Sequence, residues 1–265
     1  MIRVLVNGAD GRMGSQVVKA VVADNELELV GGVSISHIGE DLGEIAGIGA
    51  LGLAVRAGLG TAVDELKPDV VIDFTTPQAV YGNVKTCIAR GVDIVVGTTG
   101  LTEKQREELG EEAKRENTSL FIAPNFSIGA VLLMKVSADI AAYFPDVEIV
   151  ELHHNNKLDA PSGTAVMTAD KIAAARRKAG AAPAPDRTRE SLEGARGASV
   201  QAVPVHSVRL PGYVAHQEVL FGGYGEILTV RHDSLDRKSF MPGVILAVKK
   251  VSSRKGLTFG LENYL

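Results

Sequence analysis

A short apolar strand, a glycine-rich turn and a helix follow one another at the start of the chain. Ile2–Val6 is an apolar run interrupted only by Arg3, as expected of a parallel strand buried on both faces. Gly8, Gly11 and Gly14 come next, and residues 15–23 have helical character. This order predicts a Rossmann-type α/β domain whose turn holds the pyrophosphate of a dinucleotide. The spacing G-x-x-G-x-x-G differs from the commoner G-x-G-x-x-G, so we expect a turn of different shape.

Further apolar strands are predicted at 69–74, 92–96 and 119–123, with helices at 78–90 and 103–117. Ligands of open α/β sheets bind at the carboxyl ends of the strands, so the polar and glycine-rich strand ends predict the walls of a cofactor site. The glycine, threonine and proline residues at each strand end are also common in ordinary turns. Their shared position at one edge of the sheet favours a binding site. Together with the turn they give the predicted cofactor-binding residues Gly8, Ala9, Asp10, Gly11, Arg12, Met13, Phe74, Thr75, Gly97, Thr98, Thr99, Ala123, Pro124, Asn125 and Phe126.

The second strand, predicted at 27–33, ends without the acidic residue that commonly binds the ribose hydroxyls in dinucleotide folds. Ser34 and His37 stand there instead, and the next acid is Glu40. Ser34 is therefore included among the cofactor-binding residues. A 2′-phosphate would meet no carboxylate here, so NADPH is expected to be tolerated or preferred over NADH. No arginine follows the strand to bind that phosphate.

Length and composition set broad limits. The 265 residues suit two domains, and a net charge of −4 without long runs of basic residues disfavours nucleic acid and anionic membranes as partners. Cys87, the one cysteine, falls inside a predicted helix and is expected to fill the core. With no long apolar run and no export signal visible at Met1, a reducing cytoplasm is the expected compartment.

The second half of the chain predicts a smaller α+β domain with an open, mixed or antiparallel sheet. A helix at 127–143 leads into it, and strands are expected at 147–153, 199–209, 213–221 and 225–233, with hairpin turns at 211–212 and 222–223 and a mobile loop at 181–198. A helix at 239–250 and a tail at 256–265 are expected to rejoin the first domain. The predicted domains are 1–126 with 236–265 for the dinucleotide, and 127–235 for substrate and oligomerisation. One helix can cover only one face of this sheet. The other face is expected to be buried against another subunit.

The segment Glu151–Thr164 contains more candidate catalytic and substrate-binding residues than any other stretch of similar length. A strand delivers His153 and His154 to its end, Lys157 follows, and a turn leads into an alanine-rich helix capped by Ser162 or Thr164. A glycine at such a helix start leaves N–H groups and the helix dipole to bind an anion, which favours a carboxylate by roughly 0.3–1 kcal/mol. An imidazole, a cation and an anion site together suit protonation of a carbanion-like carbon in a carboxylate substrate.

Two other interpretations of this stretch remain. A surface His-His pair and a loop lysine are common in proteins without catalytic roles. A metal site could use His153, His154, Asp159 and Glu151, but adjacent residues of a strand face opposite ways and neither HxH nor HExxH spacing is present. No metal is therefore expected.

These motifs, together with Asp73-Phe74-Thr75, Gly97–Gly100, Ala123–Ser127 and His216–Glu218 before Phe221-Gly222, occur in the order seen in the 4-hydroxy-tetrahydrodipicolinate (dihydrodipicolinate) reductases. The chain resembles this family over almost its full length. The segment H-H-x-x-K-x-D-A-P-S-G-T carries most of the specificity. The chain differs from many relatives at Ser34, where they carry an acid.

The resemblance implies a nicotinamide-dependent reductase of the diaminopimelate route to lysine, with NADPH or NADH as cofactor and tetramers formed through the second domain's sheet. It implies that His153 is the general acid and that Lys157 binds a substrate carboxylate and stabilises developing charge. It further implies that His154, Gly163 and Thr164 hold the carboxylates. The competing classes are another two-domain amino-acid-pathway dehydrogenase and a non-catalytic module that senses dinucleotides.

Overall fold

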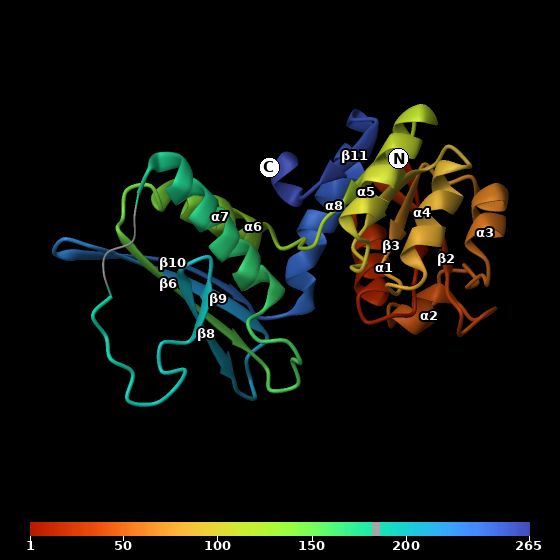
Figure 1. Cartoon of the computed structure of the whole chain (residues 1–265). Helices are drawn as coiled ribbons and strands as arrows, with labels where there is room; N and C mark the ends of the chain where they lie inside the picture. Colours follow the sequence, from red (N-terminus) through yellow and green to blue (C-terminus); the bar gives the residue numbers. More distant parts are fainter. Residues whose placement is uncertain (182–185) are drawn as a thin grey trace. The chain divides into compact units, whose positions relative to one another are not determined.

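The computed structural model describes residues 1–181 and 186–265. The chain forms two compact units (Figure 1). The first combines Met1–Ser127 with Phe240–Leu265, and the second is Ile128–Ser239. The second unit is thus inserted into the chain of the first.

The first unit contains a parallel sheet in the order β11-β5-β4-β3-β1-β2. The chain begins in β1, moves outward to β2 and then crosses to β3 on the other side of β1. This reversal creates the switch point at which open α/β sheets bind ligands, and the predicted Rossmann-type sheet is confirmed. The strands are β1 Ile2–Asn7, β2 Leu27–Val33, β3 Val70–Asp73, β4 Asp93–Val96, β5 Ser119–Ile122 and β11 Gly256–Phe259.

Helices cover this sheet because apolar strands without alternation must be buried on both faces. A core containing Leu5, Val71, Ile94 and Leu120 of the strands packs against α3, α4 and α5, and α8 contacts α1 and β4. Cys87 is fully buried in this core, as predicted. The helices are α1 Gly14–Ala23, α2 Leu42–Ala46, α3 Leu59–Leu66, α4 Val80–Ile88, α5 Glu103–Arg115 and α8 Met241–Lys250, with 3-10 turns at Arg237–Phe240, Val251–Ser253 and Leu261–Asn263.

Two segments of the first unit differ from the sequence prediction. Residues 39–60, whose glycine-rich and poorly periodic sequence predicts a loop with a short strand near 53–55, contain α2 and isolated bridges at Ala54 and Arg56. Asp41 explains the difference, because its carboxylate caps α2 and also accepts hydrogen bonds from the backbone N–H groups of residues 51–53. The expected tail at 256–265 contains β11, which extends the sheet beside β5.

The second unit contains a mixed sheet in the order β10-β9-β6-β8-β7. Its β6 and β8 are parallel and its other pairs antiparallel, so the expectation of a mixed sheet is confirmed. Both α6 and α7 pack on one face, over a core that includes Val147, Ile149, Val205 and Phe221. The elements are α6 Ile128–Ile140, β6 Asp146–His153, α7 Gly163–Ala179, β7 Ala198–Val200, β8 Val203–Arg209, β9 Ala215–Gly223 and β10 Glu226–Ser234.

Several details of this sheet correct the sequence prediction. The strand expected at 199–209 is two strands, because Gln201 and Ala202 adopt φ of 51° and 64° and turn the chain without a glycine. The turn between β9 and β10 is Tyr224-Gly225, and Gly222-Gly223 belong to β9. Residues 211–212 connect β8 to β9, which do not pair because β6 lies between them. In the predicted 181–198 loop, residues 186–197 contain no helix or strand, and Pro183 and Pro185 lie outside the described residues.

Candidate active site

The end of β6 and the start of α7 bring the predicted catalytic residues together. His153 is the last residue of β6, Lys157 lies in the following loop, and Ser162 caps α7 by accepting a hydrogen bond from Ala165 N at 3.2 Å. Of the two candidate caps, the structure therefore selects Ser162. The side chains of His153 and Lys157 are 13% and 22% exposed, so each is partly shielded but reachable.

Glu151 is the buried anchor of this region. Its carboxylate is fully buried and accepts hydrogen bonds from His153 Nδ1 at 2.5 Å, Arg209 Nη1 at 2.8 Å and Arg209 Nη2 at 2.7 Å. Ser162 N donates to the same carboxylate at 3.2 Å. Burial acts to raise the pKa of Glu151, but the hydrogen bonds from His153, Arg209 and Ser207 outweigh it and lower the pKa to about 2.

Lys157 is held by its own loop. Its Nζ donates to Asp159 Oδ1 at 2.7 Å, and this hydrogen bond lowers the pKa of Asp159. The Lys157 backbone N–H donates to His154 O at 3.2 Å, which closes the turn between the histidines and the lysine. His154 Nδ1 is buried and has no hydrogen-bond partner among the described residues. A cation and a second imidazole thus border the same turn as His153.

The first turn of α7 has free space beside Gly163, the residue after Ser162. A Cβ built on Gly163 would meet no atom within 4 Å, so the glycine is not required by packing and leaves room for another molecule to approach the backbone. Gly163 and Thr164 form the first turn of α7, where the helix dipole favours anions. No three His, Cys, Asp or Glu side chains are arranged to hold a metal ion within 1–181 and 186–265.

The glycine turn of the first unit has the geometry that a dinucleotide site requires. Gly8 has φ of +80°, and a Cβ there would collide with Phe74 O, whereas a Cβ on Gly14 would collide with Gly8 O. These glycines therefore let the turn close against β3 and against the start of α1. No side chain caps α1 at Met13, so the helix start can accept a phosphate. These residues fit the pyrophosphate of a nicotinamide dinucleotide.

Asp73 organises the neighbouring strand ends, a role that the sequence analysis missed. It is fully buried at the end of β3 and accepts hydrogen bonds from Asn7 Nδ2 and Asn83 Nδ2, both at 2.8 Å. Its other oxygen accepts from Thr75 Oγ1 at 2.8 Å and Thr98 Oγ1 at 2.6 Å. One carboxylate thus joins β1, β3, α4 and the end of β4. The sequence could have indicated this role, because Asp73 ends an apolar strand of the buried type, and a buried carboxylate needs polar partners.

Most of the remaining predicted cofactor residues lie along the same carboxyl edge. Gly97 leaves space for the Phe74 ring, since a Cβ there would collide with it. The Phe74 and Phe126 ring centroids lie 5.7 Å apart, and Asn125 Oδ1 accepts from Ser127 N at 2.8 Å. The ends of β1, β3, β4 and β5 therefore meet at one edge. The predicted residues there are Ala9, Gly11 and Arg12 after β1, Thr99 after β4, and Ala123 and Pro124 after β5.

The end of β2 differs from the sequence prediction in one respect, since a carboxylate is present there. Asp10, from the glycine turn, accepts a hydrogen bond from Ser36 Oγ at 2.5 Å. Ser34 is buried and its Oγ accepts from Ser36 N at 3.2 Å. Burial acts to raise the pKa of Asp10, but the hydrogen bonds from Ser34 and Ser36 lower it overall. Asp10 thus places a negative charge where the sequence suggested none.

The His216–Glu218 motif lies in β9 and its first two side chains have structural partners. His216 Nδ1 pairs with Asp233 at 2.6 Å, and its Nε2 accepts from Val214 N at 3.2 Å. Gln217 donates to Thr168 in α7 at 2.7 Å. This motif therefore ties β9 to β10 and to α7.

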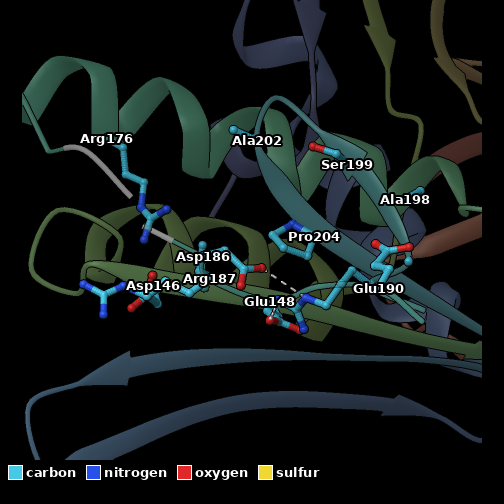
Figure 2. A pocket seen from close by; sticks show the side chains of 13 residues that line it. Asp146, Glu148, Arg176, Asp186, Arg187, Glu190, Ala198, Ser199, Ala202 and Pro204 are labelled. Atoms are coloured by element: carbon cyan, nitrogen blue, oxygen red, sulfur yellow. Dashed lines mark hydrogen bonds and ion pairs between the residues drawn. The ribbon is translucent and has the colours of Figure 1, made fainter. Parts of the chain in front are cut away.

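A hollow of about 580 Å³ lies elsewhere in the second unit, between β6, β8 and the residues after α7 (Figure 2). Arg176 and Pro204 line it, and Arg196 binds both Glu148 and Asp186 at its wall. Neither His153 nor Lys157 is among its lining residues. The predicted catalytic residues therefore lie outside this hollow, and the candidate active site is the end of β6.

Comparison with known proteins covers the whole chain. The model of the dihydrodipicolinate reductase N-terminus matches residues 2–126, and that of its C-terminus matches residues 129–265. The 4-hydroxy-tetrahydrodipicolinate reductases of Syntrophomonas wolfei and Listeria monocytogenes are 48% and 50% identical, over 99% and 100% of this chain and 98% and 100% of theirs. A dipicolinate-bound dihydrodipicolinate reductase from Paenisporosarcina sp. TG-14 matches with a TM-score of 0.89 and 45% identity, covering 100% of both chains.

The parallel sheet with its glycine turn and the second unit with its mixed sheet define a two-unit oxidoreductase of the nucleotide-dependent kind. Within that class, the chain belongs to the dihydrodipicolinate reductase family. The family resemblance expected from the sequence motifs is confirmed.

Proposed function

We propose that this chain reduces 4-hydroxy-tetrahydrodipicolinate, also described in its dehydrated form as dihydrodipicolinate, to tetrahydrodipicolinate with NADPH or NADH. The hydroxyl group of the hydroxylated form leaves as water. This reaction belongs to lysine and diaminopimelate biosynthesis, and we assign it to the cytoplasm. The observation that carries the proposal is the grouping of His153, Lys157 and the start of α7 in one loop of a chain about half identical to named reductases over its full length.

The second unit supplies the acid and the carboxylate-binding groups. His153 donates a proton to the ring carbon beside the position that receives the hydride, and Lys157 binds a carboxylate and stabilises the charge that develops. His154, Gly163 and Thr164 hold the carboxylates. Their support is the cation at Lys157, the unpartnered His154 Nδ1 and the space beside Gly163 in the first turn of α7.

The first unit holds the cofactor. A reduced nicotinamide dinucleotide supplies a hydride when bound. The glycine turn of Gly8, Gly11 and Gly14 and the uncapped start of α1 receive its pyrophosphate. The strand ends at 74–75, 97–99 and 123–126 line the rest of its site, and the buried Asp73 fixes the first two of them.

Cofactor preference depends on the end of β2. Ser34 carries no charge to repel a 2′-phosphate, whereas the carboxylate of Asp10 would repel it. We therefore propose that both cofactors are used. Fluorescence titration tests this, and binding of only one of them would contradict it.

We also propose a homotetramer built through the sheet of the second unit. The face opposite α6 and α7 carries the half-buried apolar residues Val150, Leu152 and Leu220, and Ile227 is 76% exposed. An apolar sheet face of this kind is commonly covered by another subunit. Light scattering at micromolar concentration should give a tetramer, and Ile227→Lys should weaken it. A monomeric wild-type chain would contradict the proposal.

A coupled assay tests the reaction. Pyruvate and aspartate semialdehyde are condensed enzymatically, the chain is added, and loss of reduced-nicotinamide absorbance is followed. Turnover dependent on both condensation substrates supports the proposal. Oxidation of the cofactor with aspartate semialdehyde alone would instead favour another dehydrogenase. Binding of cofactor without turnover would favour a sensing module.

No helix in the described part of the chain is long and apolar enough to cross a membrane. The dicarboxylate substrate and the acidic net charge of −4 favour a small-molecule partner over nucleic acid.

A further inference from the structure

The register of β6 and β8 places the groups that surround His153. Glu151 and His153 are two residues apart on β6, so their side chains lie on the same face of the sheet. His153 stands beside Arg209 in the parallel pairing of β6 with β8, and Glu151 stands beside Ser207. The arginine can therefore reach the carboxylate that holds the imidazole.

The carboxylate of Glu151 has different donors on its two oxygens. Oε1 accepts from Arg209 Nη2 at 2.7 Å and from Ser162 N at 3.2 Å. Oε2 accepts from Arg209 Nη1 at 2.8 Å and from His153 Nδ1 at 2.5 Å. Arg209 Nη2 also donates to Asp159 O at 2.7 Å. The pair thus joins the strand that carries His153 to the lysine loop and to the start of α7.

We propose that Glu151 and Arg209 are positioning residues for the reaction, which set the tautomer and orientation of the His153 ring. This inference rests on the proposed function of His153 as general acid. With Nδ1–H donated to Glu151, Nε2 is the nitrogen that gains and loses the catalytic proton, and Nδ1 keeps its hydrogen throughout. Arg209 holds the carboxylate by two parallel hydrogen bonds, so that its acceptor oxygen stays beside the ring.

Glu151→Gln tests the proposal because the hydrogen-bond donors around this side chain determine which way the glutamine amide is oriented. Two N–H groups that always donate, those of Arg209 Nη2 and Ser162 N, point at the Oε1 position, against one, Arg209 Nη1, at Oε2. The amide oxygen should therefore occupy the Oε1 position and the NH2 group should face His153, whose ring can change tautomer. An NH2 group facing Nδ1 favours the opposite tautomer, with hydrogen on Nε2, and opposes the doubly protonated ring that acts as an acid. Turnover should therefore fall by about 10²–10⁴-fold, the range that general acid catalysis contributes.

Glu148→Gln is the matched control. Glu148 also lies on β6 and also binds a histidine and an arginine, since His206 Nε2 lies 2.7 Å from its carboxylate and Arg196 pairs with it. It belongs to the other face of the sheet, away from His153. Its substitution should change kcat by less than about threefold, so that a general effect of losing a carboxylate in β6 is separated from the loss of Glu151.

The decisive readout is the 15N spectrum of the imidazoles, with His153 assigned by comparison with His153→Gln. We expect wild type and Glu148→Gln to carry hydrogen on Nδ1 at pH 8, and Glu151→Gln to carry it on Nε2. The KM for substrate and the Kd for NADPH should stay within about threefold while kcat falls. Unchanged tautomer and unchanged kcat in Glu151→Gln would overturn the proposal.

A further variant guards against misfolding of Glu151→Gln. Arg209→Lys keeps a positive charge beside the buried carboxylate but cannot bind both of its oxygens in parallel, so His153 should retain hydrogen on Nδ1 while kcat falls by about 10-fold or more. Wild-type kcat in Arg209→Lys would overturn the role of Arg209. The tautomer is measured without turnover. An inactive wild-type chain would therefore contradict the proposed function, whereas the spectra would still decide whether Glu151 sets the tautomer of His153.

Discussion

Arg209 and Glu151 form a two-pronged ion pair across β6 and β8, with nitrogen–oxygen distances of 2.8 and 2.7 Å around a carboxylate that is fully buried. Such a pair stabilises the fold only while both charges are present, because an unpaired buried charge costs about 3–5 kcal/mol. The second unit therefore depends on this pair for its stability as well as for the placement of His153.

The first prediction concerns acid stability. The pKa of Glu151 is lowered from 4.5 to about 2 on folding, so its contribution is present above about pH 4.5 and is lost as the pH falls from 4.5 towards 2. This contribution is on the order of 3 kcal/mol. Urea unfolding of wild type and Glu151→Gln should show a stability difference at pH 7 that shrinks by pH 3. A difference that stays constant with pH would contradict this assignment.

The second prediction concerns Lys157. Lys157→Ala should lower kcat by roughly 10²-fold and raise KM, because the ammonium is proposed to act on charge that grows in the transition state as well as on the bound carboxylate. Steady-state kinetics over a range of substrate concentrations measures both effects. Lys178→Ala, at the exposed last turn of α7, is the control and should leave both constants unchanged. A raised KM with wild-type kcat would limit Lys157 to binding.

The third prediction concerns cofactor choice. Asp10→Asn removes a negative charge at the end of β2, so the ratio of NADPH affinity to NADH affinity should rise by about 10-fold. Fluorescence titration with each cofactor measures the ratio. Asp64→Asn is the control, because Asp64 lies on α3 and pairs with Arg90 at the surface. This substitution should leave the affinity ratio unchanged. An unaltered ratio in Asp10→Asn would show that this carboxylate does not face the 2′ position.

The fourth prediction concerns Cys87. The thiol is fully buried and burial raises its pKa, so little reactive thiolate forms. No more than about a tenth of it should react with a thiol reagent in the native protein within an hour, and all of it should react in denaturant. Rapid stoichiometric labelling of the native chain would contradict the buried assignment.

Local patterns in the sequence predicted much of the fold. The strands of the first unit are short apolar runs bounded by glycine, threonine or proline, and β2 was predicted with its observed limits. The cap at Ser162 and the proline in the first turn of α8 are equally local signals. By contrast, β11 carries only four residues and no clear period, so its place beside β5 depends on the rest of the sheet.

The contacts missed from the sequence join residues that are far apart in the chain. Arg209 is 58 residues from Glu151, and their pairing depends on the parallel register of β6 and β8, which the alternation within each strand does not specify. Asp10 and Ser36 are 26 residues apart and meet only when β1 and β2 pair. Composition and period describe a strand, but its neighbours are set by the packing of the whole sheet.

The role of His153 is tested most directly by its substitution with glutamine. In the coupled assay, His153→Gln should lower kcat by about 10²–10⁴-fold, because general acid catalysis contributes that much, while the Kd for NADPH stays within about threefold of wild type. A loss of turnover below threefold, with the cofactor bound normally, would contradict the account.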